Sequence, residues 1–218
     1  MKGTDMARIV ILGGHGKVAL QLERLLAERG DEVDAVIRNP AHAPDVLETG
    51  ANAVVLDMEG SDVDTLAEVL SGYDAVVWSA GAGGGSAERT YAVDRDAAIR
   101  SMDAARAAGV GRYVMVSYFG ASTEHGVPQD DPFFAYADAK AEADEHLRAS
   151  GLDATVLQPS GLRDGPGTGL IDVEAEKSGN VDRADVAAVI AAVLADDSTI
   201  GRTIRFNEGQ EPIAQAIG

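Results

Sequence analysis

The sequence predicts an α/β fold built on a doubly wound, mostly parallel sheet with helices on both faces. Short runs rich in Val and Ile alternate with Ala-rich stretches of helical period along the chain. This alternation is typical of parallel strands joined by crossover helices. In addition, residues 54–56, 76–78 and 113–116 show no alternation of apolar and polar side chains, which indicates strands that are buried on both faces.

The elements follow one another in a regular order. The strands are expected at residues 7–12, 33–37, 53–56, 75–78, 113–116, 154–157 and 203–206. Helices are expected at residues 16–28, 92–108 and 136–149, and Gly30, Gly109 and Gly151 lie where each helix should stop. Glycine ends helices readily because it adopts the left-handed conformation at little cost.

We expect one domain over residues 7–218, preceded by a disordered leader at residues 1–6. Two glycine-rich segments, residues 81–86 and 160–180, are expected to be irregular. Both follow predicted strands, and ligands of open α/β sheets bind at the carboxyl ends of strands. Residues 160–180 are therefore a candidate substrate loop, which could close as a lid.

Composition excludes several classes of function. The net charge of −18 argues against nucleic acid and anionic membranes as partners, because both need a basic face. There is no Cys, and the four His show no ligand spacing, so no metal site is expected. No apolar run reaches the roughly 18 residues of a membrane span. These features favour a cytoplasmic protein that acts on a small-molecule substrate; they leave open the oligomeric state and whether the acidity is an adaptation to salt.

A glycine turn lies between the first strand and the first helix. The strand ends at Leu12, the turn is Gly13-Gly14-His15-Gly16, and the helix follows. This arrangement directs backbone N–H groups and the positive helix end at one point, which is how a pyrophosphate is bound. Gly13 permits the tight turn, and Gly16 permits close approach of the diphosphate. The alternative is an ordinary βα turn without a ligand.

The end of the second strand favours NADP over NAD. Arg38-Asn39 stands where an Arg accepts the 2′-phosphate of NADP and an acidic residue bonds the ribose of NAD. Alternatively, Arg38 is a solvated charge at a strand end. Asp34 could then restore NAD binding, although it lies too early in the strand to reach the ribose.

Other residues after strands complete the expected cofactor site. Asp57 and Ser79 lie on the same sheet edge as the glycine turn, although Asp57 could instead cap a helix that begins near Ser61. Lys17 could add charge near the phosphates or be a surface lysine. The residues expected to contact the cofactor are Gly13, Gly14, His15, Gly16, Lys17, Val18, Arg38, Asn39, Asp57, Met58, Ser79, Ala80, Gly81, Lys140 and Pro159.

Tyr136 and Lys140 are the candidate catalytic pair. They stand four residues apart, on one face of a predicted helix. A nearby ammonium makes the anion of a phenol more accessible, so the tyrosine can serve as a general acid or base during hydride transfer. Ser117, just past a strand, could orient a substrate carbonyl or bond its own backbone. A surface Tyr–Lys pair is the alternative.

These residues together resemble the short-chain dehydrogenase/reductase superfamily, in particular its atypical NAD(P)H-binding branch of NmrA-like and flavin reductase-like proteins. The resemblance covers nearly the whole chain. It rests on GGHGKVA at 13–19, VIRNP at 36–40, VVLDME at 54–59, YADAKAEADEHLRASGLDATVLQPSGL at 136–162 and NVDRADVAAVIAAVL at 180–194.

The resemblance implies a Rossmann-like sheet of seven or eight strands and a bound nicotinamide dinucleotide. Tyr136 would be the proton donor, while Lys140 would hold the ribose hydroxyls and lower the pKa of the tyrosine. The chain departs from the family pattern at three points. Ala19 replaces a glycine, Ser117-Tyr118 replaces a serine pair, and residues 92–108 contain no Asn for a proton relay.

The function expected from the sequence is that of an NADP-dependent reductase, which transfers hydride to a small carbonyl, quinone or flavin-like substrate. One alternative is a non-catalytic NADP-binding redox sensor or regulatory protein, favoured by the missing Asn. The other is an enzyme similar to sugar-nucleotide epimerases and dehydratases. The intact Tyr136 and Lys140 favour an enzyme.

Overall fold

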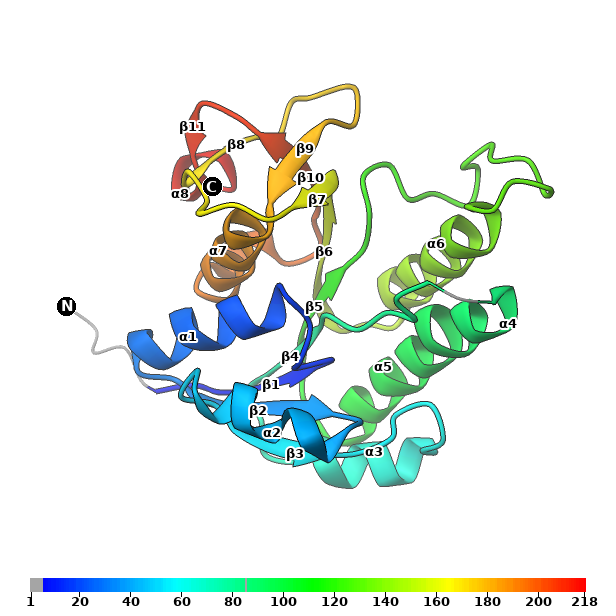
Figure 1. The fold of residues 1–218 in the computed structure, drawn as a ribbon. Helices are drawn as coiled ribbons and strands as arrows, with labels where there is room; N and C mark the ends of the chain where they lie inside the picture. The colour runs from blue at the N-terminus through cyan, green and yellow to red at the C-terminus, as the bar shows by residue number, and fades with distance from the viewer. Residues whose placement is uncertain (1–5, 85) are drawn as a thin grey trace.

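The computed structural model describes residues 6–84 and 86–218, so the predicted leader lies outside the described residues except for Met6. Its centre is a nine-stranded sheet in the order β11-β8-β10-β6-β5-β4-β1-β2-β3 (Figure 1). A separate parallel pair consists of β7 (Gly161–Arg163) and β9 (Asn180–Asp182). The strands of the large sheet are β1 (Arg8–Leu12), β2 (Glu32–Ile37), β3 (Asn52–Val55), β4 (Ala75–Trp78), β5 (Arg112–Val116), β6 (Asp153–Pro159), β8 (Leu170–Asp172), β10 (Thr203–Glu208) and β11 (Glu211–Pro212).

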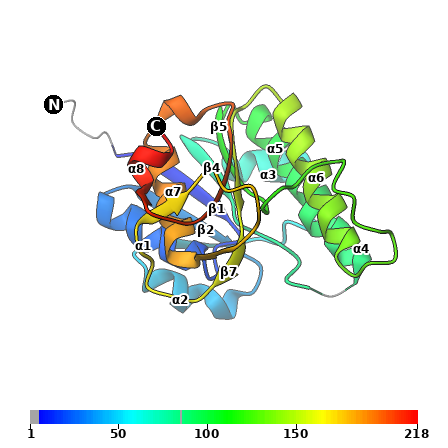
Figure 2. The ribbon, with the colours of Figure 1, turned by 90° about the horizontal axis from the view of Figure 1, so that it is seen from above.

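Helices cover both faces of this sheet, which Figure 2 shows from above. On one face α1 contacts α7, and on the other α5 contacts both α3 and α6. The helices are α1 (Ala19–Arg29), α2 (Ala43–Leu47), α3 (Val63–Leu70), α4 (Ala87–Thr90), α5 (Ala98–Ala107), α6 (Phe134–Ala149), α7 (Arg183–Leu194) and α8 (Ile213–Ala216), with short turns η1 (Pro40–His42) and η3 (Asp197–Thr199) and a π-helical turn η2 (Tyr91–Ala97).

The order of the parallel strands confirms the predicted Rossmann-like α/β fold. Strands β3, β2, β1, β4, β5, β6 and β10 pair in parallel, whereas β8 runs antiparallel to β10 and β11. Strand β1 lies between β2 and β4, so the chain leaves it first to one side and later to the other. A crevice opens where the direction of winding changes, outside the carboxyl ends of these strands.

Each face of the sheet has its own apolar core. Leu22 and Leu26 of α1 and Val189 of α7 are fully buried on one face, and Trp78 and Met102 on the other. A fully buried side chain of this size contributes about 1.5–3 kcal/mol to stability. The apolar runs at 76–78 and 113–116 therefore reflect burial of central strands from both sides. The same prediction for residues 54–56 is wrong, because β3 is the edge strand of the sheet and Val55 is 53% exposed.

Several boundaries differ from those predicted. The helix expected from residue 16 begins at Ala19, because residues 13–18 form the turn that precedes it. The helix expected at 92–108 opens with the π-helical turn η2 and becomes regular only at Ala98. The large sheet has nine strands instead of seven or eight, because β8 and β11 extend its edge.

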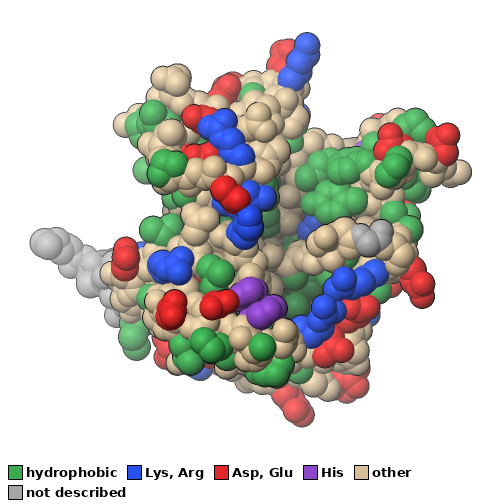
Figure 3. Space-filling view, viewed as in Figure 1, with side chains coloured by type: hydrophobic (Ala, Val, Ile, Leu, Met, Phe, Trp, Pro, Cys, Tyr) green, Lys and Arg blue, Asp and Glu red, His purple; other side chains and the backbone are tan. Residues whose placement is uncertain are grey.

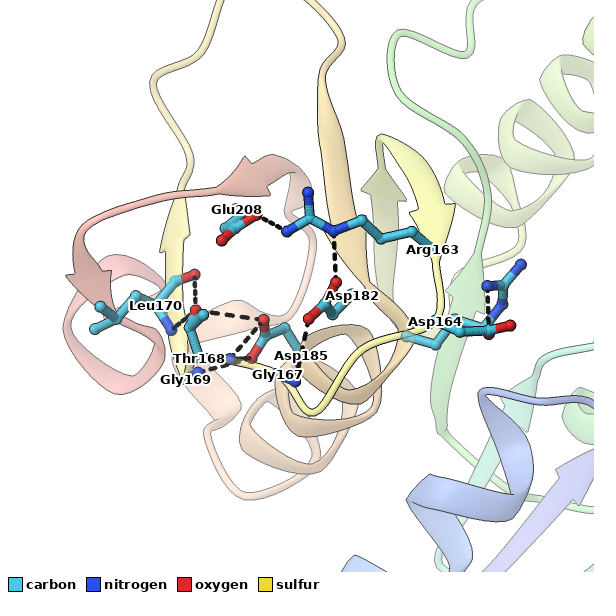
Figure 4. Close-up of polar contacts among 10 residues, drawn as sticks. Arg163, Asp164, Gly167, Thr168, Gly169, Leu170, Asp182, Asp185 and Glu208 are labelled. Carbon is cyan, nitrogen blue, oxygen red and sulfur yellow. Dashed lines mark hydrogen bonds and ion pairs between the residues drawn. The ribbon is translucent and has the colours of Figure 1, made fainter.

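Residues 160–180 are more ordered than predicted. They contain β7 and β8, and β9 begins at Asn180. Two carboxylates at the start of α7 hold the connection between these strands (Figure 4). Asp182 accepts a hydrogen bond from the Gly167 amide at 3.2 Å, and Asp185 accepts from the Thr168 and Gly169 amides at 2.9 and 2.7 Å.

None of the helices in the described part of the chain combines the length and the apolar composition that a membrane-spanning helix requires.

Candidate functional site

Two adjoining cavities occupy the crevice at the carboxyl ends of β1 and β4. The inner cavity has a volume of about 540 Å³ and extends towards α6 and α7. The outer cavity has a volume of about 280 Å³ and extends towards β2 and β3. Gly16, Ser79, Ala80 and Gly81 line both cavities, so the two are parts of one elongated site. Lys, Arg and His side chains gather around this hollow (Figure 3).

The glycine turn forms the wall between the cavities. Gly13 has a φ of +94°, and a Cβ atom there would lie 2.6 Å from the Ala80 Cα atom. The amides of Gly13 and Gly14 donate to the Val36 carbonyl at 3.2 and 2.9 Å, which fixes the turn against β2. Within the described residues, the amides of Lys17 and Val18 donate no hydrogen bond and lie at the start of α1. Free amides at a helix N-terminus suit a diphosphate, so the turn fits a dinucleotide.

The outer cavity is lined by Arg38 and Asn39 from the end of β2. Arg38 is 60% exposed in its side chain, and its guanidinium lies 3.6 Å from the Glu59 carboxylate. The rings of His15 and His42 stack with their centroids 3.7 Å apart and also line this cavity. The exposed guanidinium of Arg38 offers several N–H donors to a phosphate. The Nε2 atom of His15 is already engaged, at 2.7 Å from the Asp45 carboxylate.

Asp34 is not available to the outer cavity. It lies in the middle of β2 and accepts a hydrogen bond from the Asn52 amide at 2.9 Å and another from the Tyr73 hydroxyl. Arg8 lies 3.8 Å from the same carboxylate. These contacts use both carboxylate oxygens of Asp34.

Asp57 and Met58 line the outer cavity after β3, as predicted. The alternative interpretation of Asp57 as a helix cap is wrong, because Asp62 caps α3 by accepting a hydrogen bond from the Thr65 amide at 2.9 Å. Asp57 instead accepts from the Glu59 amide at 3.3 Å within the loop.

The predicted catalytic residues meet in the inner cavity, where Tyr136, Lys140 and Ser117 are all lining residues. The Lys140 ammonium lies 6.0 Å from the centre of the Tyr136 ring and donates a hydrogen bond to the Val116 carbonyl at 3.1 Å. The start of α6 carries the two residues on one helical face, as their spacing predicts.

Asp94, which the sequence patterns do not single out, completes this group. Its carboxylate is 1% exposed, lies 3.4 Å from the Lys140 ammonium, and accepts a hydrogen bond from the Ala82 amide at 2.9 Å. The π-helical turn η2 presents it to the cavity. The helix predicted at residues 92–108 has no Asn for a proton relay, and Asp94 is the side chain of that segment that contacts Lys140.

The local electrostatics keep the Tyr136 phenol protonated and the Lys140 amine charged. Burial raises the pKa of Tyr136, and Asp94 and Asp144 raise it further, whereas Lys140 lowers it; the net shift is upward. Burial alone would lower the pKa of Lys140, but Tyr136, Asp94 and Asp144 outweigh that effect and raise it. The downward effect of Lys140 on the tyrosine is therefore present but does not prevail. A protonated phenol can donate a proton at neutral pH.

Ser117 lies beside this pair, but its hydroxyl is already engaged. It donates to the buried Asp144 carboxylate at 2.7 Å. Burial raises the pKa of Asp144, while Ser117, Lys140, Arg148 and Gln158 lower it less strongly. With its single proton given to Asp144, the Ser117 hydroxyl can offer a substrate a lone pair more readily than a proton.

Most of the predicted site residues line one of the two cavities, and two do not. Gly14 packs against Ala35. A Cβ atom at Gly14 would lie 2.5 Å from the Ala35 Cβ atom, so this position needs a glycine for the turn to form. Pro159 is buried at the end of β6, and its carbonyl accepts from the Phe119 amide at 2.8 Å. The cavity-lining residues that sequence reasoning missed include His42, Arg89, Asp94, Leu162 and Arg183.

The comparisons with known proteins agree with this geometry. The family model described as NAD(P)H-binding matches residues 13–197. The Bacillus subtilis protein named "Uncharacterized sugar epimerase YhfK" is 33% identical and aligns with 96% of this chain and 98% of its own length.

Two solved structures extend the likeness to the fold. A Bacillus halodurans structure, whose name refers to an NAD-dependent epimerase/dehydratase, is 33% identical, has a TM-score of 0.89, and covers 97% of this chain and 98% of its own. The oxidoreductase ylbE from Lactococcus lactis is 29% identical, with a TM-score of 0.86 and coverage of 96% and 94%. With the glycine turn, the parallel sheet and the matched residues in agreement, this chain belongs to the NAD(P)H-binding family and has its structural neighbours in the atypical short-chain dehydrogenase/reductase group.

Proposed function

We propose that the protein is an NADP-dependent reductase that acts on a small carbonyl, quinone or flavin-like substrate in the inner cavity. The observation that carries the proposal is the Tyr136 phenol, which lines the cavity with its pKa raised and a charged Lys140 nearby. When bound, NADPH supplies a hydride to the substrate. Tyr136 donates its proton to the oxygen, or the corresponding acceptor atom, on which negative charge develops.

Lys140 stabilises the tyrosinate that this proton transfer leaves behind. Its ammonium is held by the Val116 carbonyl and the Asp94 carboxylate, so it stays fixed while the phenol changes its charge. A fixed cation in a buried site stabilises developing negative charge more strongly than a solvated one does. Solvent then returns a proton to Tyr136.

The preference for NADP over NAD rests on the outer cavity. Arg38 is exposed at the rim with one weak ionic partner, so its guanidinium is free to bind a 2′-phosphate. Asp34, the acidic residue of β2 that could favour NAD, is bound by Asn52 and Tyr73. The stacked rings of His15 and His42 line the same cavity.

The cofactor part of the proposal is tested by titrating the protein with NADPH and with NADH, following cofactor fluorescence at one fixed salt concentration. We expect tighter binding of NADPH, and Arg38→Ala should weaken NADPH at least about tenfold and NADH much less, because only NADPH carries the extra phosphate. Arg24→Ala, which removes an exposed arginine of α1, is the control for net charge. Equal losses of both cofactors in Arg38→Ala would refute the assignment.

The catalytic part is tested with Tyr136→Phe. NADPH consumption with the best substrate from a panel of carbonyls, quinones and flavins should fall at least about tenfold, since positioned proton transfer contributes typically 10²–10⁴. NADPH affinity should stay the same, because the phenol is not assigned to cofactor binding. If the variant and the parent turn over equally, Tyr136 is not the proton donor. A protein that binds NADPH but reduces nothing in the panel would be a sensor instead.

An epimerase-like reaction is the second candidate, favoured by the names of the two Bacillus relatives. In such a reaction the oxidised cofactor would take a hydride from the substrate and return it, so the cofactor shows no net change. The same Tyr136 would then act as base and acid in turn. Stoichiometric oxidation of NADPH, measured at 340 nm, favours the reductase, whereas substrate isomerisation with no net change in absorbance favours the epimerase.

A further inference from the structure

Two cations at the mouth of the inner cavity are held by a single carboxylate. Lys17, at the glycine turn, and Arg183, the first residue of α7, both line the cavity. The Asp164 carboxylate bridges them, with one oxygen 2.8 Å from the Lys17 ammonium and the other 2.7 Å from the Arg183 guanidinium. Figure 4 shows Asp164 on the strand-connecting segment, ahead of the part that Asp182 and Asp185 hold.

The charges of the cavity lining leave a positive excess at this mouth. The described residues that line it include four charged side chains: Lys17, Asp94, Lys140 and Arg183. Asp94 and Lys140 neutralise each other at 3.4 Å in the interior, and among the described residues Asp164 is the ionic partner of both mouth cations. In a chain with a net charge of −18, such a local excess would concentrate anions that the rest of the surface repels.

Asp164 can be displaced at little cost. Its side chain is 67% exposed, and that of Lys17 is 68% exposed. Ion pairs between groups this exposed are weak, because water screens them. A carboxylate of a ligand could therefore replace Asp164 on Arg183, whose side chain is only 22% exposed and whose guanidinium can bind a carboxylate through two parallel hydrogen bonds.

The surfaces beside these cations are apolar. Leu162 of β7 is 39% exposed and lines the inner cavity, and Tyr136 and Pro132 line it too. Phe133 is 44% exposed and packs on the Tyr136 ring, with ring centroids 5.3 Å apart. Exposed apolar side chains of this size beside a cavity are typical of a site that covers an apolar ligand.

We propose that Arg183, assisted by Lys17, is an anion subsite that receives a carboxylate of the substrate, whose flat apolar body lies between Leu162 and Tyr136. The inference rests on the proposed function, because it names the class of substrate. Asp164 occupies the subsite until the substrate arrives. Arg183 and Leu162 line only the inner cavity, which favours the substrate over the adenosine part of the cofactor as the occupant.

The subsite is tested with 2-naphthoate and its neutral analogue 2-naphthamide, titrated by calorimetry into the protein alone and into the protein saturated with NADP⁺. Naphthoate should bind at least about tenfold more tightly than the amide. Arg183→Gln should reduce naphthoate affinity to that of the amide, and Arg183→Lys should give an intermediate value. Asp164→Asn should strengthen naphthoate binding, because it removes the competing charge.

The controls separate this inference from the proposed function. Arg24→Gln, an exposed arginine of α1, should leave naphthoate affinity unchanged. NADPH affinity, measured on each variant by fluorescence, should change less than about twofold in Arg183→Gln. A failure of NADPH to bind would refute the proposed function, while naphthoate binding to the protein alone would still report on the subsite.

Three results would overturn the inference. The first is equal binding of naphthoate and naphthamide, or no binding of naphthoate up to about 10 mM, the range expected of very weak ligands. The second is unchanged naphthoate affinity in a folded Arg183→Gln variant. The third is a loss of NADPH affinity in Arg183→Gln as large as the loss for naphthoate, which would assign Arg183 to the cofactor.

Discussion

In the outer cavity Arg38 is exposed and weakly paired, whereas in the interior of the inner cavity Asp94 and Lys140 are buried and held from several sides. Arg38 is 60% exposed, and a single carboxylate lies 3.6 Å away. Asp94 and Lys140 are 1% and 3% exposed in their side chains, and each also bonds the backbone of a loop or strand.

This difference separates two kinds of residue in one site. A charge in the outer cavity is mostly solvated, so changing it should alter ligand affinity and leave the fold nearly as stable. Asp94 and Lys140, in the interior of the inner cavity, have lost their water, and their partners replace that hydration. Residues that carry the proposed chemistry are therefore tied to stability, while those that choose the cofactor are not.

The largest effect should come from Asp94→Ala. It leaves the Lys140 ammonium buried without its ionic partner, and breaking a buried pair costs about 3–5 kcal/mol. Asp94→Asn retains an acceptor for the Ala82 amide and should cost less. Urea unfolding at neutral pH measures both values, with Arg38→Ala as the comparison from the outer cavity, where we expect under about 0.5 kcal/mol. Similar losses in Asp94→Ala and Arg38→Ala would remove the distinction between the cavities.

A smaller effect is expected at Glu23, a buried carboxylate of α1 that lines neither cavity. Its side chain is fully buried, and one oxygen accepts from the Thr49 hydroxyl at 3.0 Å, while the other has no partner among the described residues. Burial raises the pKa of Glu23 to about 7. Because the folded state then binds its proton more tightly than the unfolded state, stability falls as pH rises from about 4.5 through 7.

Glu23→Gln removes this penalty. At pH 8 the variant should be about 1–3 kcal/mol more stable than the parent, and the difference should shrink to under about 1 kcal/mol at pH 5. Urea unfolding at the two pH values measures it, and Glu28→Gln, exposed on the same helix, controls for the lost charge. A difference that is the same at both pH values would show that ionisation of Glu23 is not the cause.

The fold could be predicted from the sequence because its signals are local. Strands buried on both faces leave continuous apolar runs, and Gly30 ends α1 with a φ of +97° as its position predicts. The π-helical turn before α5 leaves no such signal. Its hydrogen bonds span five residues where those of an α-helix span four, and a single wider turn changes the pattern of apolar residues too little to be recognised. The order in residues 160–180 depends on Asp182 and Asp185, which contact it from the next helix.

The site was predictable only where one segment carries the whole signal. The glycine turn and the Tyr136–Lys140 pair are each contained in a few residues. Asp94 and Arg183 reach the cavity from other segments, and no sequence motif near either residue predicts that it lines the cavity. One signal for Asp94 was present, because it precedes Ala98 and Met102 by four and eight residues and so shares their buried helix face.

Only a small change in stability is expected within the glycine turn itself, at Gly16. An added Cβ atom would lie 3.2 Å from the Gly13 carbonyl oxygen and 3.5 Å from that of Ser79, and φ at Gly16 is not positive. Gly16→Ala should therefore cost under about 1 kcal/mol of unfolding free energy. NADPH affinity should still fall about tenfold, because the methyl group occupies the wall shared by the two cavities, where a diphosphate approaches the backbone.

In Gly13→Ala, the loss of stability should be the larger effect and should exceed that of Gly16→Ala. The positive φ of Gly13 and the 2.6 Å approach to the Ala80 Cα atom mean that the turn itself must move. Urea unfolding and NADPH titration on both variants separate the two effects. If Gly16→Ala binds NADPH as tightly as the parent, the turn shapes the fold without holding the cofactor. The diphosphate would then have to bind at another part of the two cavities.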